Sequence, residues 1–303
     1  MSSNEKETYF GKEGAVSGGH LNLSETVDCP LCHRPPTRFA VDYQGFQLCQ
    51  CDGCGLQFQS PRLTFDELAD KVYTKDYCPG HEDSANDGAY SRQLSHFEKL
   101  IGRVGSVLDV GCGNGSFLEF ARKGGWETFG ADILLSPETS TLTCPLWEGR
   151  LTEIDFDGAR FDVIRFNHVL EHLQNPLDEL ARCRDLLNPG GIVFIGVPNL
   201  AGISPRIKNF QSRLGLKQKR WRHYAATHHL YFFTPSTLRL MIERAGFLVL
   251  DWETPVDKDQ KKFGTTLYKK FAEASGVGSN MDFYITPKPE LRPNVPPAED
   301  KNT

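Results

Sequence analysis

The sequence lacks any apolar run that approaches the roughly 20 residues required by a membrane-spanning helix. Its first ten residues, MSSNEKETYF, lack the basic start and the apolar stretch of a signal peptide. Basic residues are fewer than acidic ones, 34 against 39, and the formal net charge is -5, whereas a general nucleic-acid binder needs clustered Lys and Arg. We therefore expect a cytoplasmic protein with neither a membrane nor a nucleic acid as its partner.

Cysteine is present in an odd number, nine, in a chain of 303 residues, which argues against a small fold stapled by disulfides. We expect a reduced compartment in which the thiols bind metal or pack. Apolar residues make up 39% of the chain, enough for an ample core in one large domain or two unequal ones. The oligomeric state cannot be read from the sequence.

Composition and periodicity divide the chain into five segments. We expect a flexible leader over residues 1–26, a cysteine-rich module over 27–60, a helical connector over 61–97, a large domain over 98–286 and a disordered tail over 287–303. In the large domain, short apolar runs alternate with helical patterns, which predicts an α/β fold with a doubly wound sheet. The expected buried parallel strands are Val107–Val110, Thr128–Ala131, Phe161–Phe166 and Ile192–Val197.

A late helix is signalled at both ends. Thr234 is placed as its N-cap, Pro235 as its first residue and Gly246 as its stop. The strand Phe247–Trp252 is expected to follow.

A glycine-rich turn follows the first expected strand, where VLDVGCGNGSF contains Gly111, Gly113 and Gly115. Glycine accepts positive φ angles and lets a ligand approach the backbone closely. The pattern is G-x-G-x-G, not the G-x-G-x-x-G of dinucleotide-binding turns, and Asp109 before it offers a carboxylate to a cationic ligand. Asp132 ends the next strand 23 residues after Asp109, near the offset of about 20 at which an acid reaches ribose hydroxyls.

These residues resemble the first motif of class I S-adenosylmethionine-dependent methyltransferases. The strings FDVIRFNHVLEH and LLNPGGIVFI resemble later parts of that fold, and the likeness covers roughly residues 98–255. It implies a Rossmann-like sheet and S-adenosylmethionine as the cofactor, with the glycine turn at its methionine part, Asp132 at the ribose and Leu151 near the adenine. The cofactor-binding residues that follow are Asp109, Gly111, Gly113, Gly115, Asp132, Leu151 and Asn167.

Two C-x-x-C pairs, Cys29 with Cys32 and Cys51 with Cys54, are separated by 18 residues. This spacing is typical of a four-thiolate zinc site, which leaves no open coordination position and is structural. Phe39, Val41, Gly45, Phe46 and Leu48 can form a β-hairpin between the two pairs. The module resembles the N-terminal zinc ribbon of small-molecule methyltransferases, including those that act on sugars, and some ribosomal-RNA methyltransferases carry one too.

Three residues with i, i+3, i+4 spacing, His168, Glu171 and His172, follow the third expected strand. This spacing predicts one helix face at the sheet edge where ligands bind. Three interpretations remain open: His168 as general base, a divalent metal site completed by His228 or His229, and a structural role. Ubiquinone-biosynthesis and small-RNA methyltransferases carry a similar metal motif, although His168 stands here in place of its first acid.

Residues 206–233 are expected to form a lid over the acceptor, with Tyr224 and His229 as further catalytic candidates. Asp and Glu are absent from Leu186 through Ile242, while seven basic residues lie between Arg206 and Arg222. Such a field attracts anions, unless the segment is only a solvated basic surface.

We therefore predict a methyltransferase acting on a small or carrier-bound anionic acceptor. Two alternatives remain: an RNA methyltransferase that grips RNA with the zinc ribbon, and a non-catalytic cofactor-binding partner subunit.

Overall fold

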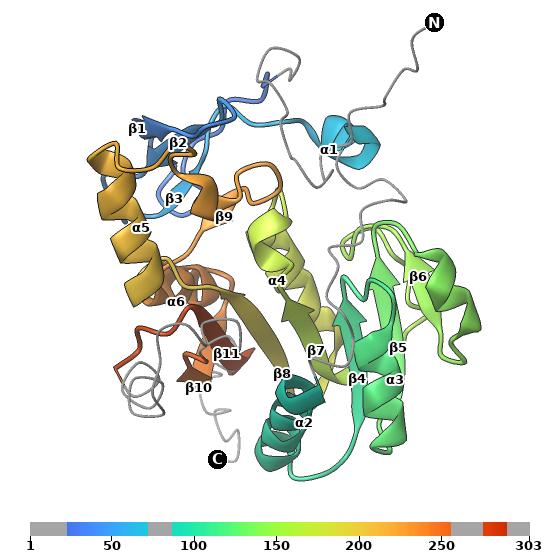
Figure 1. Cartoon of the computed structure of the whole chain (residues 1–303). Coiled ribbons are helices and arrows are strands. Elements are labelled where there is room, and N and C mark those ends of the chain that lie inside the picture. Colours follow the sequence, from blue (N-terminus) through green and yellow to red (C-terminus); the bar gives the residue numbers. More distant parts are fainter. Residues whose placement is uncertain (1–22, 72–86, 256–274, 290–303) are drawn as a thin grey trace, which may run out of the picture.

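The computed structural model of the chain describes residues 23–71, 87–255 and 275–289. Most of the expected leader and tail therefore lies outside the described residues. The chain forms two sheets, a larger one of seven strands and a smaller one of four (Figure 1). In the part of the chain that is described, every helix is too short or too polar to cross a bilayer.

The larger sheet confirms the expected doubly wound α/β fold. Its strands, in spatial order, are β10 (Phe247–Glu253), β11 (Asn280–Pro287), β8 (Leu187–Pro198), β7 (Phe161–Asn167), β4 (Ser106–Val110), β5 (Glu127–Asp132) and β6 (Leu146–Glu148). Strands β8, β7, β4, β5 and β6 pair in parallel, whereas β11 runs antiparallel to both β8 and β10. The four predicted parallel strands are present as β4, β5, β7 and β8, while β11 was missed.

Helices cover this sheet. They are α2 (Asp87–Ile101), α3 (Ser116–Lys123), α4 (Pro176–Leu186) and α6 (Pro235–Arg244), and a short α1 (Phe65–Lys71) precedes them. The predicted ends of α6 are confirmed, because the Thr234 side chain accepts a hydrogen bond from the backbone N–H of Thr237 in a capping box. Gly246 follows the helix with φ 83°, a conformation that favours glycine.

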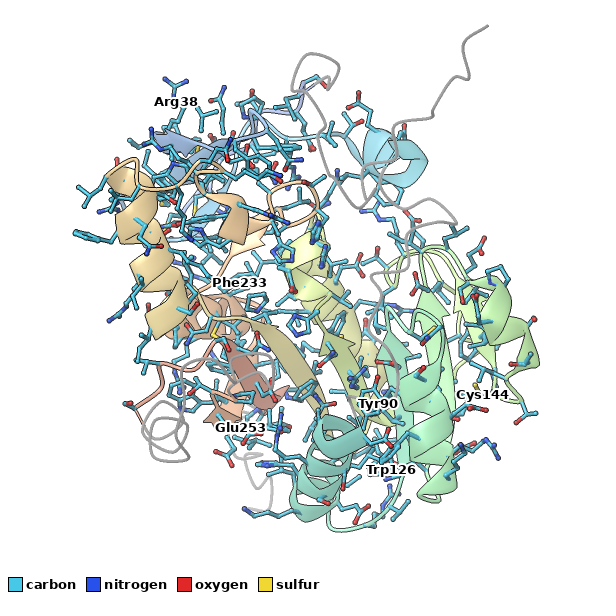
Figure 2. The ribbon with its side chains drawn as sticks, in the orientation of Figure 1. Arg38, Tyr90, Trp126, Cys144, Phe233 and Glu253 are labelled. Carbon is cyan, nitrogen blue, oxygen red and sulfur yellow. The ribbon has the colours of Figure 1, made fainter. Side chains whose placement is uncertain are left out.

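Helix α2 is part of the larger α/β unit. Phe97 is fully buried and its ring lies 5.5 Å from that of Phe194 on β8. Tyr90 and Trp126, both labelled in Figure 2, join the same layer: Tyr90 packs on Phe117 of α3, and Trp126 on Phe97. The expected boundary between residues 97 and 98 therefore falls inside a helix that packs on the sheet.

The smaller sheet contains the predicted hairpin and a strand from far along the chain. Its order is β1 (Thr37–Val41), β2 (Gln47–Gln50), β3 (Gln57–Gln59) and β9 (Tyr231–Phe232). Trp221, Tyr224 and Phe232 share a buried cluster with Phe46 and Leu48 of the hairpin. The cysteine module is therefore built together with the segment expected to form the acceptor lid.

This late segment also holds helix α5 (Ile203–Arg213) and a 3-10 turn, η4 (Arg222–Tyr224). Helix α5 lies beside the smaller sheet at one side of the molecule (Figure 1). Buried residues of the cysteine module and of the larger sheet, such as Leu56 and Ile195, belong to one continuous core. The two sheets are thus packed against each other.

Candidate functional site at the carboxyl edge of the larger sheet

The glycine turn joins β4 to α3 in the predicted way. Gly111, Gly113 and Gly115 all have positive φ angles, of 72°, 56° and 82°, which glycine adopts at low cost. A side chain at Gly111 would collide with Val169, and one at Gly115 with Leu142. A side chain at Gly113 would meet none of the described residues within 4 Å, so the backbone there borders space that a ligand can enter.

Asp132 lies against this turn from the end of β5. Its Oδ2 accepts a hydrogen bond of 2.9 Å from the Gly113 backbone N–H, and its Oδ1 accepts one from Leu134. Burial raises the pKa of the Asp132 carboxyl, and the backbone N–H groups oppose that rise. The structure thus brings the two cofactor-binding candidates with the clearest sequence signals, Gly113 and Asp132, into direct contact.

Asp109 is not a free carboxylate, which corrects the idea that it offers its charge to a cationic ligand. It is 2% exposed, and its Oδ1 accepts a 2.7 Å hydrogen bond from Nη1 of Arg165 on β7. Burial raises the pKa of Asp109 to about 6, although the Arg165 guanidinium acts to lower it. Arg165 therefore neutralises the charge beneath the glycine turn.

Arg165 also organises residues that the sequence analysis missed. Its Nε donates to Gln93 Oε1 of α2, and Gln93 Nε2 donates to Oδ1 of the predicted cofactor residue Asn167. The guanidinium carbon lies 3.9 Å from the Phe117 ring centroid, within cation–π range. The available signal was an arginine in the middle of a strand expected to be buried, since such a buried charge requires a partner.

Leu151, which was expected near the adenine, follows β6 in the chain. Its side chain is 3% exposed and belongs to the main core. Any contact between Leu151 and a ligand must therefore come from its backbone.

His168 and Glu171 do not lie on a regular helix, which corrects the expected helix face. His168 has φ 57°, and its backbone N–H donates to the Gly196 carbonyl of β8. Only a 3-10 turn, η3 (Leu170–His172), follows before α4 starts at Pro176. The pairing of β7 with β8 thus engages the N–H of His168. Proline at the first position of α4 also disfavours helical backbone at the residue before it.

The turn nevertheless gathers imidazoles around one carboxylate. Glu171 is 1% exposed, and among the described residues neither of its oxygens has a hydrogen-bond partner. His168 Nδ1 lies 3.4 Å from Glu171 Oε1, and the Nε2 atoms of His172 and His229 each lie 4.0 Å from it. Ligand atoms of Glu171, His172 and His229 lie within 4.8 Å of one another.

Backbone carbonyls orient two of these imidazoles. His172 Nδ1 lies 3.0 Å from the His228 carbonyl, and His229 Nδ1 lies 3.1 Å from the Tyr224 carbonyl. Because a carbonyl can only accept, each Nδ1 carries the proton when the ring is neutral, which makes Nε2 the candidate ligand atom of each ring. Burial lowers the pKa of both rings, which favours the neutral form. Two neutral imidazoles and a buried carboxylate without donors among the described residues form a set that suits a cation.

Tyr224 contributes its backbone carbonyl to this cluster, and His228 contributes both its carbonyl and its ring. The Tyr224 hydroxyl donates to Gln57 of β3 at 2.8 Å, its side chain is 2% exposed and burial raises its pKa. This corrects its selection as a catalytic hydroxyl, because the smaller sheet already engages that group. Burial also lowers the pKa of His228 to about 3, and its ring stacks on His172.

A small cavity of about 40 Å³ adjoins the cluster and is lined by Glu171, His229 and Phe233, among others. That volume is sufficient for a single water or ion.

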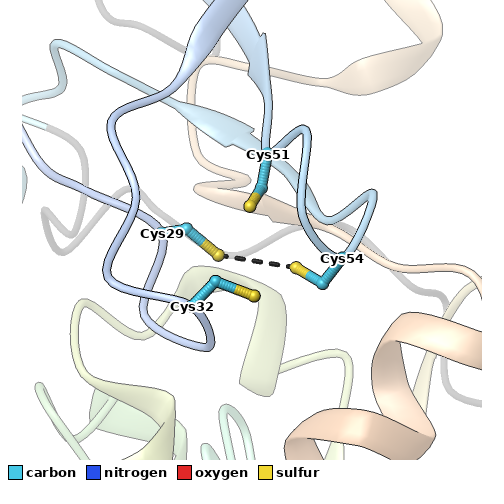
Figure 3. Close-up of side chains that lie close together, drawn as sticks. All are labelled: Cys29, Cys32, Cys51 and Cys54. Carbon is cyan, nitrogen blue, oxygen red and sulfur yellow. Dashed lines mark hydrogen bonds between the residues drawn. The ribbon is translucent and has the colours of Figure 1, made fainter.

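The four predicted cysteines meet at one point of the smaller sheet (Figure 3). The sulfurs of Cys29, Cys32, Cys51 and Cys54 lie within 4.8 Å of one another, and those of Cys29 and Cys54 are 3.6 Å apart. That distance is too long for a disulfide and close to the roughly 3.8 Å edge of a tetrahedron with 2.3 Å zinc–sulfur bonds. The arrangement is compatible with zinc.

The two cysteine turns are built alike. The backbone N–H of His33 donates to Cys29 and that of Gly55 to Cys51, and both donors have positive φ angles. His33 therefore closes a turn. Cys49, which lies outside the group of four, is buried, and its thiol is directed to the Ser60 carbonyl.

Comparison with known proteins identifies the larger unit. Residues 83–251 match the family model described as "Methyltransferase domain". The ubiquinone biosynthesis O-methyltransferase of Cereibacter sphaeroides is 30% identical over 190 residues, which are 59% of this chain and 71% of that protein. The enzyme of the same name from Roseobacter denitrificans is 27% identical over 201 residues, covering 62% and 79% of the two chains.

A solved structure shares the fold. It is 1,6-didemethyltoxoflavin-N1-methyltransferase of Burkholderia thailandensis, with S-adenosylhomocysteine bound in that crystal. It superposes with a TM-score of 0.54 at 18% identity and covers 84% of this chain and 99% of its own. With the glycine turn, Asp132 and the strand order, these matches show that the chain belongs to the methyltransferase-domain family of class I S-adenosylmethionine-dependent methyltransferases.

Proposed function

We propose that the protein transfers a methyl group from S-adenosylmethionine to a hydroxyl of a small or carrier-bound anionic acceptor. The observation that carries this proposal is the contact between the glycine turn and the imidazole–carboxylate cluster at one sheet edge. Gly111 abuts Val169, which lies between His168 and Glu171 in the chain. A methyl donor held at the turn would thus lie beside groups able to activate a hydroxyl. The hydroxyl itself is suggested by the relatives, which are named O-methyltransferases.

The methyl donor fits the residues at the turn. Asp132 can accept hydrogen bonds from ribose hydroxyls, since each oxygen has a further lone pair beyond the one bonded by Gly113 or Leu134. The open space beside Gly113 admits the amino-acid part of the donor. Asn167, fixed by Gln93, ends the neighbouring strand at the same edge. Leu151 would meet the adenine through its backbone.

A divalent cation fits Glu171, His172 and His229. The two carboxylate oxygens lack donors among the described residues, and backbone carbonyls hold both imidazoles with Nε2 toward Glu171. When bound, such a cation would lower the pKa of an acceptor hydroxyl. His229, rather than His228, completes the set, because ligand atoms of Glu171, His172 and His229 lie within 4.8 Å of one another.

His168 is the proposed general base. Its side chain is 40% exposed, unlike the other members of the cluster, and Glu171 lies 3.4 Å from its Nδ1. The nearby carboxylate positions the ring. In the proposed step the acceptor oxygen attacks the methyl carbon, the carbon–sulfur bond breaks with its electron pair left on sulfur, and the hydroxyl proton passes to His168. Alignment of the two reactants supplies much of the rate.

The four cysteines are proposed to hold one structural zinc. Their thiolates would fill all four positions of the ion, so the zinc takes no part in the chemistry. Its function would be to fix the smaller sheet, whose strand β9 leads from His229.

The anionic character of the acceptor is inferred from the segment between Arg206 and Arg222. It contains seven basic residues and no acidic one, and its continuation, Ala225–His229, reaches the cluster. A positive field near a site raises the local concentration of anions.

Incubation of the full chain with methyl-labelled S-adenosylmethionine and a metabolite extract tests the proposal. We expect label in one small or carrier-bound anionic product, with magnesium or manganese present. Tight binding of S-adenosylmethionine without any labelled product would instead support a non-catalytic partner subunit. Label found in RNA would support the RNA methyltransferase.

A further inference from the structure

Helix α5 presents an apolar row to solvent. Ile207, Phe210 and Leu214 are spaced i, i+3, i+7 and so share one face of the helix. Their exposed fractions are 50%, 62% and 57%, and Leu216 just beyond them is 67% exposed. Among the described residues these four are the most exposed large apolar side chains of the protein. We call this row, together with Arg206 and Arg213 on the same helix, the α5 face.

The side of α5 that faces the protein is polar. Ser212 is fully buried, and its hydroxyl accepts a hydrogen bond from the Trp221 backbone N–H. Asn209 Oδ1 lies 2.7 Å from His223 Nε2, and the Ser212 carbonyl accepts from Arg220 Nε. A surface helix ordinarily packs its apolar side on the core, and α5 has the reverse orientation. Hydrogen bonds, rather than buried apolar area, hold this helix in place.

The end of α5 extends the row. Gly215 has φ 70°, its N–H donates to the Ser212 carbonyl, and the N–H of Leu216 donates to the Gln211 carbonyl. These two bonds are those of a Schellman motif, in which the residue after the glycine commonly packs back on the last turn. Leu216 therefore occupies the position of this motif that follows directly on the last turn of α5.

Basic residues lie on the same helix as the row and in the segment that follows it. Arg206 and Arg213 lie one position before Ile207 and Leu214 on the same helix, and both are exposed. Exposed basic residues follow in the next segment: Lys219, Arg220 and Arg222. Because no Asp or Glu occurs from Leu186 through Ile242, no acidic residue of this segment opposes an anionic surface.

We propose that the α5 face binds the surface of an anionic phospholipid bilayer. A helix with exposed large apolar side chains beside Lys and Arg is typical of elements that lie in the headgroup region. Its apolar row would enter the acyl boundary, and its basic residues would contact anionic headgroups. This would be peripheral attachment, and it revises the expectation that no membrane is involved. It does not depend on the proposed methyl acceptor.

The shape of the α5 face favours a lipid surface over an acidic protein. Helix α5, which carries the exposed row, lies at the side of the molecule (Figure 1). A protein partner would need a matching groove to bury it, whereas lipid headgroups move aside. The same segment continues through His223, hydrogen-bonded to α5, to the Tyr224 carbonyl that holds His229. Attachment would therefore place the carboxyl edge of the larger sheet near the bilayer.

Vesicle co-sedimentation of the full chain provides the test. We expect binding to vesicles of mixed phosphatidylcholine and phosphatidylglycerol, and little binding to phosphatidylcholine alone. Raising the ionic strength from about 0.1 M to about 1 M should weaken binding, because the Debye length falls from about 10 Å to about 3 Å. The triple variant Ile207→Ser, Phe210→Ser, Leu214→Ser should lower the partition coefficient by about 100-fold.

A matched control carries Leu248→Ser and Leu250→Ser on β10, two side chains that are 44% and 48% exposed. It should bind vesicles like the wild type, and S-adenosylmethionine affinity should show that both variants are folded. The proposal is overturned if the wild type ignores anionic vesicles, or if the triple variant binds as well as the control. Binding of a purified acidic acyl carrier protein through α5, without vesicle binding, would assign the surface to a protein partner instead.

Discussion

The cysteine cluster and the imidazole–carboxylate cluster are both groups of metal-ligating side chains, yet they are assembled differently. The four cysteines belong to two short turns with the same backbone hydrogen bonds. Glu171 and His172 lie in one turn after β7, whereas His229 arrives from beyond β8 and α5. The first cluster depends on local geometry, and the second depends on how the two sheets are packed together.

This difference suggests a difference in use. A closed set of four thiolates leaves no room for a reactant. The second cluster has a carboxylate and two imidazoles, a small cavity beside it, and the more exposed His168 at its margin. We therefore propose a role in folding for the first cluster and a role in chemistry for the second.

The variant Cys51→Ser should have the largest effect and tests whether damage to the first cluster reaches the second. Structural zinc contributes on the order of 10 kcal/mol to the folding of small metal domains. Because β9 pairs with β3 next to His229, we expect loss of zinc, unfolding of the smaller sheet and weaker cation binding at Glu171. Metal analysis and thermal unfolding measure this effect. Intact manganese binding in the variant would show that the two clusters are independent.

The variant Arg165→Met removes the support beneath the glycine turn. It leaves Asp109 buried without a partner, which should lower the free energy of unfolding by about 3–5 kcal/mol. Urea denaturation measures this change, and Asp109→Asn in the same chain should restore most of the stability. An Arg165→Met variant as stable as the wild type would contradict the pairing.

The same pair makes stability depend on pH. The pKa of Asp109 is raised to about 6, above the ordinary value near 3.9. The folded state therefore binds more protons between these values, and this group lowers stability as the pH rises from about 4 to about 6. Without Arg165 the pKa of Asp109 should rise further. In Arg165→Met the pH-dependent loss of stability should therefore continue to a higher pH than in the wild type.

The variant His168→Gln tests the more exposed residue of the second cluster independently of the buried candidate ligands. Loss of a general base should reduce kcat by about 10²–10⁴-fold, while S-adenosylmethionine affinity stays unchanged. The acceptor found in the extract screen provides the assay. An unchanged kcat and pH profile would leave His168 with a structural role.

The variant Asp132→Ala should have the smallest effect, and this effect should be limited to the binding of the methyl donor. Lost hydrogen bonds between the ribose and a charged group should cost about 1.5–3 kcal/mol, which is a ten-fold or larger loss of affinity by calorimetry. Asp155→Ala, an acidic residue in the loop before β7, is a matched control. Equal affinities in the two variants would refute the role of Asp132.

Local patterns explain which features could be predicted from the sequence. Four predicted features each depend on residues close together in the chain. They are the two C-x-x-C pairs, the glycine turn, the ends of α6 and the apolar runs of β4, β5, β7 and β8. The family resemblance rested on such patterns as well.

Long-range contacts explain the rest. Three features depend on tertiary structure: Arg165 pairs with Asp109, the His168 N–H donates to the Gly196 carbonyl, and β9 pairs with the smaller sheet. The i, i+3, i+4 spacing predicted a helix at His168. The hydrogen bond that prevents this helix joins His168 to Gly196, which is far away in the sequence, so a short stretch of sequence does not reveal it. His229 remained one of two candidates for the same reason.

A manganese titration of the zinc-loaded full chain tests the central assignment most directly. We predict one manganese ion per chain in addition to the cysteine-bound zinc, with binding abolished by Glu171→Gln and retained by His228→Asn. The zinc content should remain unchanged in both variants. No manganese binding by the wild type, or equal binding by Glu171→Gln, would contradict the assignment of chemistry to the second cluster.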